Sequence, residues 1–272
     1  MERSGSRVIA IGGGELAESR EVLDRIFELL RHKEDARVLI MTVATNEVDG
    51  TYDKYDPIFR KRGVKHVEMV DVSAREDGFD DAGVQKIERA DCIFFTGGDQ
   101  LNITSLFGGS PLHDALVRRV EQGVVVAGTS AGAAMMSSCM IVEGRNDEPP
   151  KAECLNMGPG LDLIASTIID THFSQRGRHG RLLTAIAHYP QYIGLGIDPL
   201  TAIEVYNGGF KVLGSGSVTI IDAARMSFTD LAYKKRSEPF GMFDVTVHVL
   251  PREYTYDLKS RQPAAPENAA AV

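Results

Sequence analysis

Short apolar runs alternate with helix-like segments along the first half of the chain, and this alternation limits the possible folds. Between the runs, residues such as Val22, Ile26 and Leu29 recur at helical spacing. Continuous apolar strands between helices are typical of a parallel sheet that is covered on both faces. The sequence therefore predicts an α/β fold with a mostly parallel sheet flanked by helices on both faces. The predicted strands are Val8–Ile11, Val38–Met41, Val67–Val70, Cys92–Phe95 and Val124–Val126.

The second half of the chain has a different character. Residues 142–160 are rich in polar, glycine and proline residues, which predicts a loop over the site, and residues 163–169 predict a further strand. Beyond Thr201, apolar runs separated by turn residues predict a C-terminal antiparallel β extension. We expect residues 1–258 to form a single α/β domain and residues 259–272 to be a disordered tail.

Composition excludes several classes of function. The 272 residues carry a net charge of −8 and no basic stripe with interleaved aromatic residues, which argues against a nucleic-acid partner. No apolar stretch approaches the roughly 18 residues of a membrane span, and the first residues do not resemble a secretory signal. Cys92, Cys139 and Cys154 lack the spacing of metal ligands. We therefore expect a cytoplasmic protein with no metal, cofactor or membrane partner.

Ser130 lies in Gly128-Thr129-Ser130-Ala131-Gly132, directly after an apolar run and before a helix-prone segment. A strand, a glycine-flanked serine and a helix, in this order, are typical of a nucleophile elbow, whose sharp turn lifts the hydroxyl above the sheet edge. The N–H groups that begin the following helix point to where an oxyanion would form. A plain strand-to-helix turn or a phosphate-binding loop also fits these five residues.

His172 is the best placed of the seven histidines to act as a general base for Ser130. It follows a predicted strand at its carboxyl end, the edge where chemistry gathers in parallel sheets. Arg176, Arg178 and Arg181 come next, near a predicted helix start where positive charge is unfavourable without an anionic partner. Because guanidinium groups bind carboxylates bidentately, the pattern predicts a substrate with carboxylates. A solvated, charged helix start is the alternative.

Two glycine-containing loops end at the same predicted edge. In Thr96-Gly97-Gly98-Asp99-Gln100, we expect the Gly98 N–H to form an oxyanion hole with that of Ala131, and Gln100 to bind the substrate backbone. An ordinary strand-to-helix turn is the alternative. The other loop, Gly12-Gly13-Gly14, lacks the spacing of a dinucleotide-binding motif and fits a backbone turn close to the site.

Together, these motifs resemble the cyanophycinase family of serine peptidases. The resemblance covers most of the chain, and its motifs are Gly12–Glu15, Thr96–Leu101, Gly128–Ala133, Asp170-x-His172-Phe173 with the following arginines, and Gly196-Ile197-Asp198. It implies a glutamine-amidotransferase-like three-layer sandwich, a homodimer, Ser130 as nucleophile and His172 as its base. The implied pocket residues are Gln100, Asp170, Thr171, Arg176, Arg178 and Arg181.

The resemblance also implies a substrate. Cyanophycin is a storage polymer with a poly-aspartate backbone and an arginine on each side-chain carboxylate, and the family releases β-aspartyl-arginine dipeptides from it exolytically. The arginines of the pocket would bind carboxylates of the polymer, while acids such as Asp170 would bind its guanidinium groups.

Two positions depart from the pattern of the family. Pro199 follows the Gly-Ile-Asp turn directly, where the family has the glutamate of its catalytic triad, and proline cannot orient an imidazole. Asp198 is then the nearest candidate acid, and Asp170 is the second. Thr171 stands where a glutamine is usual, which shortens one polar contact of the pocket.

Two other functions remain open from the sequence. One is a peptidase for small aspartyl peptides. The other is a catalytically impaired homologue that binds cyanophycin or its products, because Pro199 removes the usual orienting acid and loss of such a group can cost about 10⁴ in kcat.

Overall fold

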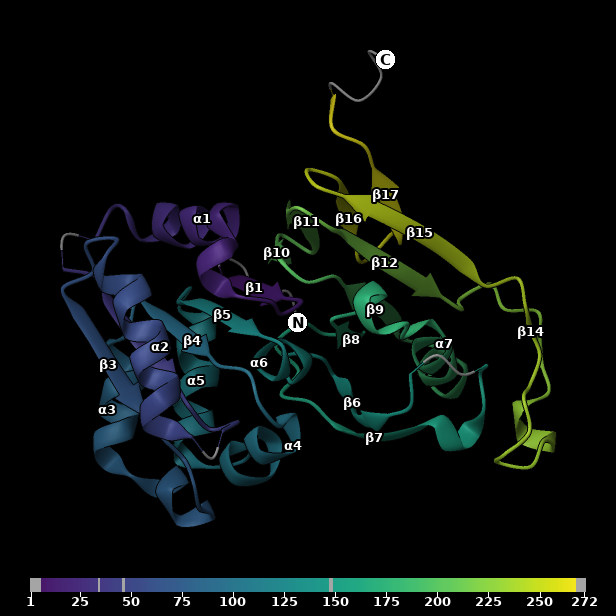
Figure 1. The fold of residues 1–272 in the computed structure, drawn as a ribbon, viewed down its shortest axis with the longest axis horizontal. Helices are drawn as coiled ribbons and strands as arrows, with labels where there is room; N and C mark the ends of the chain where they lie inside the picture. Colours follow the sequence, from purple (N-terminus) through teal and green to yellow (C-terminus); the bar gives the residue numbers. More distant parts are fainter. Residues whose placement is uncertain (1–5, 34, 46, 147–148, 268–272) are drawn as a thin grey trace.

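The computed structural model describes residues 6–267 except 34, 46, 147 and 148, and within this range nine strands form the central sheet (Figure 1). Five of them are parallel, in the order β1 (Arg7–Ile11), β5 (Val125–Thr129), β4 (Cys92–Phe95), β2 (Arg37–Met41) and β3 (His66–Val70). On the other side of β1 the sheet continues antiparallel through β10 (Thr201–Tyr206), β11 (Gly209–Gly214), β16 (Thr255–Asp257) and β17 (Gln262–Ala264). The predicted α/β class and antiparallel extension are confirmed.

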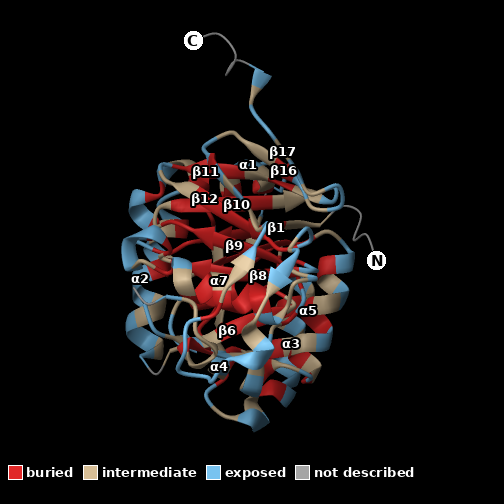
Figure 2. Ribbon diagram, turned by 90° about the vertical axis from the view of Figure 1, so that its right-hand side faces the viewer, coloured by how far each residue is buried: buried red, intermediate tan, exposed pale blue. Residues whose placement is uncertain are grey.

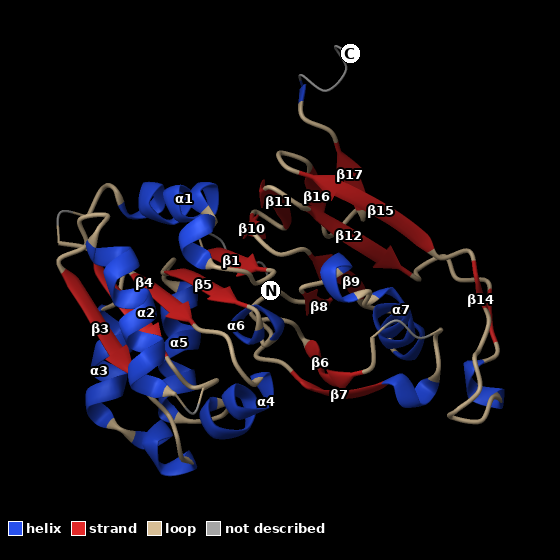
Figure 3. Cartoon of the chain, viewed as in Figure 1, coloured by secondary structure: helices blue, strands red, loops and turns tan. Residues whose placement is uncertain are grey.

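Helices cover both faces of the parallel part of this sheet (Figure 3). Successive strand side chains point to opposite faces, so Ile9 packs with α1 and α2, whereas Val8 and Ala10 belong to the core that includes α3, α5 and α6. The strands are buried and the outward helix faces are exposed (Figure 2). The helices are α1 (Arg20–Leu30), α2 (Val48–Arg60), α3 (Asp81–Arg89), α4 (Gln100–Asn102), continued by a π-helical turn at Ile103–Phe107, α5 (Pro111–Glu121) and α6 (Ala131–Ala134).

A second sheet adds a layer that the sequence did not predict. Among the described residues it has the order β15 (Thr246–Pro251), β12 (Ser217–Asp222), β9 (Ile193–Ile197) and β8 (Thr167–Thr171). Its Ile169 and Leu195 share a buried cluster with Phe95 of the central sheet, while α7 (His179–His188) packs on the other face of this sheet. The strands β8 and β9 are parallel, so the carboxyl ends of both meet at one edge.

Smaller elements complete the fold. Two hairpins pair β6 (Cys139–Gly144) with β7 (Leu155–Pro159) and β13 (Phe228–Thr229) with β14 (Met242–Phe243). Short 3₁₀ turns occur at Leu16–Glu18, Arg75–Phe79, Ala152–Cys154, Ser174–Arg176 and Leu231–Tyr233. No helix in the described part of the chain is long and apolar enough to cross a membrane.

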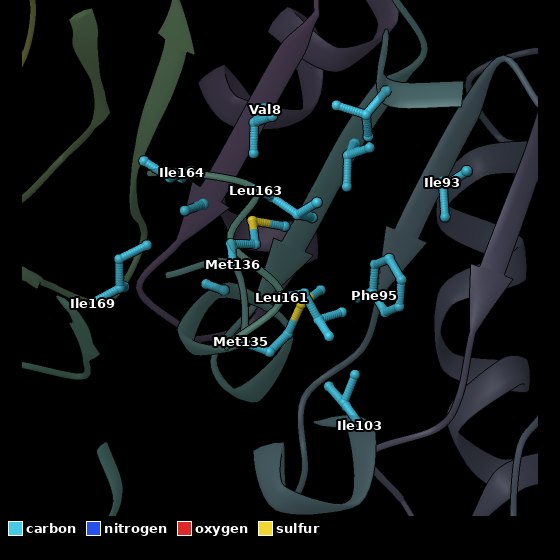
Figure 4. Packing of buried hydrophobic residues seen from close by; sticks show 14 of the residues in the cluster. Val8, Ile93, Phe95, Ile103, Met135, Met136, Leu161, Leu163, Ile164 and Ile169 are labelled. Atoms are coloured by element: carbon cyan, nitrogen blue, oxygen red, sulfur yellow. The ribbon is translucent and has the colours of Figure 1, made fainter. Parts of the chain in front are cut away.

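Three expectations about the second half need correction. Residues 142–160 include parts of the paired strands β6 and β7 rather than loop alone. The predicted strand at 163–169 begins later, at Thr167. Leu163 and Ile164 instead pack in the buried cluster that contains Met136 (Figure 4), and the Ile164 N–H donates to the Met136 carbonyl at 2.8 Å.

The third correction concerns the expected tail. Residues 262–264 form β17, the edge strand of the sheet, which pairs with β16. Pro263 lacks an N–H and is tolerated there because an edge strand has a partner strand on one side only. The expectation of disorder is wrong for these residues, and residues 268–272 lie outside the described part. That residues 1–258 form one domain stays a prediction.

A buried carboxylate ties α1 to the central sheet. Glu204 of β10 is only 2% exposed and accepts hydrogen bonds from Arg7 Nη1 at 3.0 Å and from Arg25 Nε and Nη2 at 2.8 Å each. Arg25 also contacts Glu28 on the helix surface. Removing one partner of a buried ion pair destabilises a protein far more than removing one partner of an exposed pair, because the remaining charge is left uncompensated.

We predict that Glu204→Gln lowers the free energy of unfolding by about 2–4 kcal/mol, since two half-buried guanidinium groups lose their counter-charge. Urea unfolding measures the change. Glu28→Gln is the matched control, because it removes the exposed carboxylate partner of the same Arg25 and should leave the midpoint almost unchanged. Equal effects of the two substitutions would contradict the prediction.

Candidate active site

The backbone at Ser130 makes the sharp turn of a nucleophile elbow. Ser130 lies between β5 and α6 with φ 53° and ψ −111°, and its N–H donates to the Ile11 carbonyl at 3.0 Å. The chain is so tight here that a Cβ on Gly128 would lie 2.3 Å from the Gly132 carbonyl oxygen. Glycine is therefore required at this close approach, and the strained serine sits at the carboxyl edge of the sheet as predicted.

His172 reaches this serine from the second sheet. It follows β8 with φ 49°, and its N–H donates to the Gly12 carbonyl at 2.7 Å. Its Nε2 lies 3.2 Å from Ser130 Oγ, within hydrogen-bond reach. The imidazole occupies the space over Gly13, whose φ is 101°, since a Cβ there would lie 2.2 Å from Nε2. The predicted backbone turn at Gly12–Gly14 thus makes room for the ring.

The other imidazole nitrogen faces an amide that the sequence interpretation did not single out. Gln175 Oε1 lies 3.3 Å from His172 Nδ1. With Nδ1–H donating to this oxygen, Nε2 presents its lone pair to the Ser130 hydroxyl. Gln175 lies on the 3₁₀ turn Ser174–Arg176, three residues after His172, and this closeness in the sequence was the available signal.

Asp198 does not reach His172, which corrects its assignment as the orienting acid. Its Oδ1 accepts from the N–H and Oγ of Ser174, and its Oδ2 accepts from the N–H and Oγ of Ser217. Burial raises the pKa of Asp198, but these four hydrogen bonds outweigh burial and lower it overall. The Asp198 carboxylate thus links the segment at Ser174 to the segment at Ser217.

The electrostatics around His172 favour its neutral form. Burial is the larger cause that lowers its pKa from the usual value, and the positive charge of Arg176 lowers it further. The hydrogen bond to Gln175 and the charge of Asp170 act in the opposite direction but do not compensate. A neutral imidazole beside a hydroxyl can accept its proton.

Asp170 and two of the arginines form a buried ion cluster. Arg181 binds Asp170 through Nε at 2.7 Å and Nη2 at 2.5 Å, while Arg178 Nη1 donates to Asp170 at 3.2 Å and to the Thr171 carbonyl at 2.6 Å. Asp170 is 2% exposed. Burial lowers the pKa of Arg178 to about 10 despite this partner. The expectation that Asp170 binds substrate guanidinium groups is wrong here, because its charge is already balanced within the protein.

The remaining predicted pocket residues have different surroundings. Gln100 Nε2 donates to the carbonyls of Ile141 and Val142, both at 2.8 Å, so this amide fastens β6 to α4. Thr171 is buried, and Arg176 is exposed on the 3₁₀ turn. Of the three predicted arginines, Arg176 is thus the one with an exposed guanidinium.

The two N–H groups predicted for an oxyanion hole belong to segments next to Ser130: Ala131 follows it directly, and Gly98 lies in the neighbouring loop. Neither the Gly98 N–H nor the Ala131 N–H is a donor in any hydrogen bond of the described residues. Gly98 has φ 140° and passes so close to the Ala44 carbonyl that a Cβ would lie 1.9 Å from its oxygen. A Cβ on Gly97 would lie 3.5 Å from that of Ser130, which places this loop beside the serine.

These groups surround a cavity of about 320 Å³, the size of a small-ligand site. Its lining includes Ser130, Gly98 and the arginine cluster, and also Glu143 of β6, which the sequence interpretation missed. Glu143 is exposed, and among the residues that the structure describes its carboxylate has no ion pair or hydrogen-bond partner. The cavity therefore presents Arg176 and Glu143 as charges of opposite sign.

Metal or thiol chemistry has no candidate residues in the described part of the chain. No group of three His, Cys, Asp or Glu residues there is arranged to hold a metal ion. Cys92, Cys139 and Cys154 are buried and form no disulfide with one another, and burial raises the pKa of the Cys92 thiol to about 12.

Known proteins resemble this chain over most of its length. The chain is 35% identical over 263 residues to a cyanophycinase from Geminocystis herdmanii, covering 96% of each chain. It is 35% identical over 246 residues to a cyanophycinase from a Nostoc species, covering 89% of this chain and 82% of that one. The resemblance found in the sequence is confirmed.

Solved structures support the fold. A peptidase from an acI-B1 actinobacterium matches with a TM-score of 0.60 at 19% identity, covering 90% of this chain and 99% of the other. A putative peptidase E from Listeria monocytogenes matches with a TM-score of 0.52 at 14% identity, covering 77% of this chain and 98% of the other. The model of peptidase family S51 matches residues 8–213. This chain belongs to peptidase family S51.

Proposed function

We propose that this protein is a serine exopeptidase that hydrolyses the backbone of cyanophycin and releases β-aspartyl-arginine dipeptides. The observation that carries the proposal is the 3.2 Å contact between Ser130 Oγ and His172 Nε2, at a cavity that presents both signs of charge. The relatives named cyanophycinase, which this chain matches over most of its length, support the choice of substrate. A cytoplasmic location and a homodimer stay predictions.

The first half of the reaction forms an acyl-enzyme. His172 Nε2 takes the proton of Ser130 as Oγ attacks the carbonyl carbon of the scissile bond. The negative charge that develops on the carbonyl oxygen is stabilised by the N–H groups of Gly98 and Ala131. His172 then gives its proton to the leaving amine as the C–N bond breaks.

The second half releases the acid product. Water takes the place of the leaving group, His172 removes a proton from it, and the resulting hydroxide attacks the ester carbon. The tetrahedral intermediate collapses, the bond to Ser130 Oγ breaks, and His172 returns a proton to the serine.

The charges of the cavity fit a zwitterionic substrate. Arg176 would bind a carboxylate of the polymer, and Glu143 would bind the guanidinium of an arginine side chain. Glu143 thereby takes the part that was expected of Asp170, whose carboxylate is occupied by Arg178 and Arg181.

We predict that Ser130→Ala abolishes dipeptide release from purified cyanophycin, lowering the rate by at least about 10³-fold, because among the described residues His172 contacts no other hydroxyl. Chromatography with mass spectrometry of the products measures this. Ser105→Ala, at an exposed serine outside the cavity, is the control and should act like the unsubstituted protein. Full activity of Ser130→Ala would overturn the proposal. Release from small aspartyl peptides but not from the polymer would favour the dipeptidase alternative.

We predict that kcat/KM rises with pH through a value below the ordinary 6.5 of histidine. His172 must be neutral to act as base, and its lowered pKa keeps it neutral to more acidic pH. Arg176→Gln should move this acidic limb to higher pH, because the substitution removes a positive charge that disfavours the imidazolium. Burial, the larger cause, still lowers the pKa of His172 in this variant. A pH–rate profile of both proteins gives the two positions. A limb that moves to lower pH would be inconsistent with this assignment.

We predict that Glu143→Gln raises KM for cyanophycin about tenfold with little change in kcat, through loss of a charge-assisted hydrogen bond to guanidinium. Steady-state kinetics on the polymer measures both constants. Glu153→Gln, which changes a carboxylate paired with Arg145, is the matched control and should leave KM unchanged. An unchanged KM in Glu143→Gln would exclude this contact.

A further inference from the structure

Both nitrogens of His172 have partners, and neither partner is a carboxylate. Nε2 faces Ser130 Oγ at 3.2 Å and Nδ1 faces Gln175 Oε1 at 3.3 Å. Among the described residues, no hydrogen bond joins an acid to this ring. The two acids that the sequence suggested are bound elsewhere: Asp198 by serines and Asp170 by arginines.

The turn that carries Gln175 is fixed at both ends. The Arg176 N–H donates to the His172 carbonyl at 3.1 Å, so the chain folds back over the histidine. Asp198 Oδ1 holds the preceding residue, Ser174, through its N–H at 3.0 Å and its Oγ at 2.5 Å. Gly177 closes the turn in a left-handed conformation with φ 59°. Asp198 therefore acts on the site indirectly, by anchoring the segment that presents Gln175.

A side-chain amide can do part of what a triad acid does. Its oxygen accepts the Nδ1–H bond, which selects the tautomer whose Nε2 can deprotonate a serine, and Cys-His-Asn sites use an amide in the same way. We propose that Gln175 is the positioning residue of His172, taking the place of the acid that Pro199 leaves out. This inference rests on the proposed roles of Ser130 and His172.

An amide differs from a carboxylate in one measurable respect. It carries no charge, so it orients the imidazole without stabilising the imidazolium as strongly. The charged groups that act on His172 are Arg176 and Arg178, which disfavour the imidazolium, and Asp170, which favours it. A carboxylate introduced at position 175 would therefore add an opposite charge directly at Nδ1 and raise the pKa of His172.

The test uses Gln175→Met, which keeps the size of the side chain and removes the amide, and Gln175→Glu, which replaces the amide by an acid. The pKa of His172 is read by NMR titration of the substrate-free protein, with its resonance assigned by its loss in His172→Ala. Gln191→Glu is the matched control, because it adds the same charge at an exposed glutamine near the opposite end of β9. The rate of dipeptide release from cyanophycin gives kcat and KM for each variant.

We expect Gln175→Met to lower kcat at least about tenfold with KM changed by less than about threefold, because this side chain is not part of the cavity lining. Gln175→Glu should retain kcat, raise the pKa of His172 by about one unit or more and move the acidic limb of kcat/KM upward by the same amount. Gln191→Glu should leave all three values unchanged.

The inference is overturned if Gln175→Met turns over like the unsubstituted protein, or if Gln175→Glu shifts the His172 titration no more than Gln191→Glu does. Its failure is distinguishable from failure of the proposed function. A protein that releases no dipeptide from cyanophycin, but whose His172 titration responds to Gln175→Glu, supports the contact and refutes the substrate.

Discussion

Three consecutive backbone carbonyls at the carboxyl end of β1 hold the site together. The Ile11 carbonyl accepts from the N–H of Ser130, the Gly12 carbonyl from that of His172, and the Gly13 carbonyl from that of Leu200. The proposed nucleophile, the proposed base and the turn after Asp198 are thus fixed to one strand end, although they are far apart in the sequence. Glycines at 12 and 13 are needed here, because side chains would overlap the Asp198 carbonyl and the His172 ring. The catalytic geometry consequently depends on the sheet more than on any single side-chain contact.

Charge in the site is divided between structure and surface. Arg178 and Arg181 share the single carboxylate of Asp170 in a buried cluster, which costs desolvation and is stable only because each group has a partner. This cluster fastens the start of α7 to β8, and Arg181 also donates to the Gly144 carbonyl of β6. Arg176 and Glu143 remain exposed in the cavity lining. In the proposed function these two exposed charges contact the substrate, while Asp170, Arg178 and Arg181 hold the cavity wall together.

The surroundings of His172 show how a missing acid can be accommodated. Pro199 removes a side chain that could accept a proton, and Asp198 next to it is turned toward Ser174 and Ser217. The bonds to Ser174 stabilise the 3₁₀ turn on which Gln175 lies. Asp198 therefore still contributes to the orientation of the imidazole, although it acts through this turn and does not contact the ring. An arrangement of this kind fixes the tautomer of the histidine but leaves its charge less compensated, in keeping with the lowered pKa of His172.

The amino-acid sequence by itself determined the parallel strands, the elbow at Ser130 and the position of His172, because these depend on local apolar periodicity and on short motifs. The second sheet and β17 could not be predicted this way, since strand pairing is a choice among distant partners. The pairing of charged side chains could not be predicted from the sequence either. The sequence shows that Asp170 carries a carboxylate and that the three arginines carry guanidinium groups. Only the tertiary structure decides which of these groups pair with each other and which face the cavity. Likewise, only the fold turns Asp198 away from His172 and brings Gln175 to it, because hydrogen-bond direction depends on backbone angles that a residue's identity does not set.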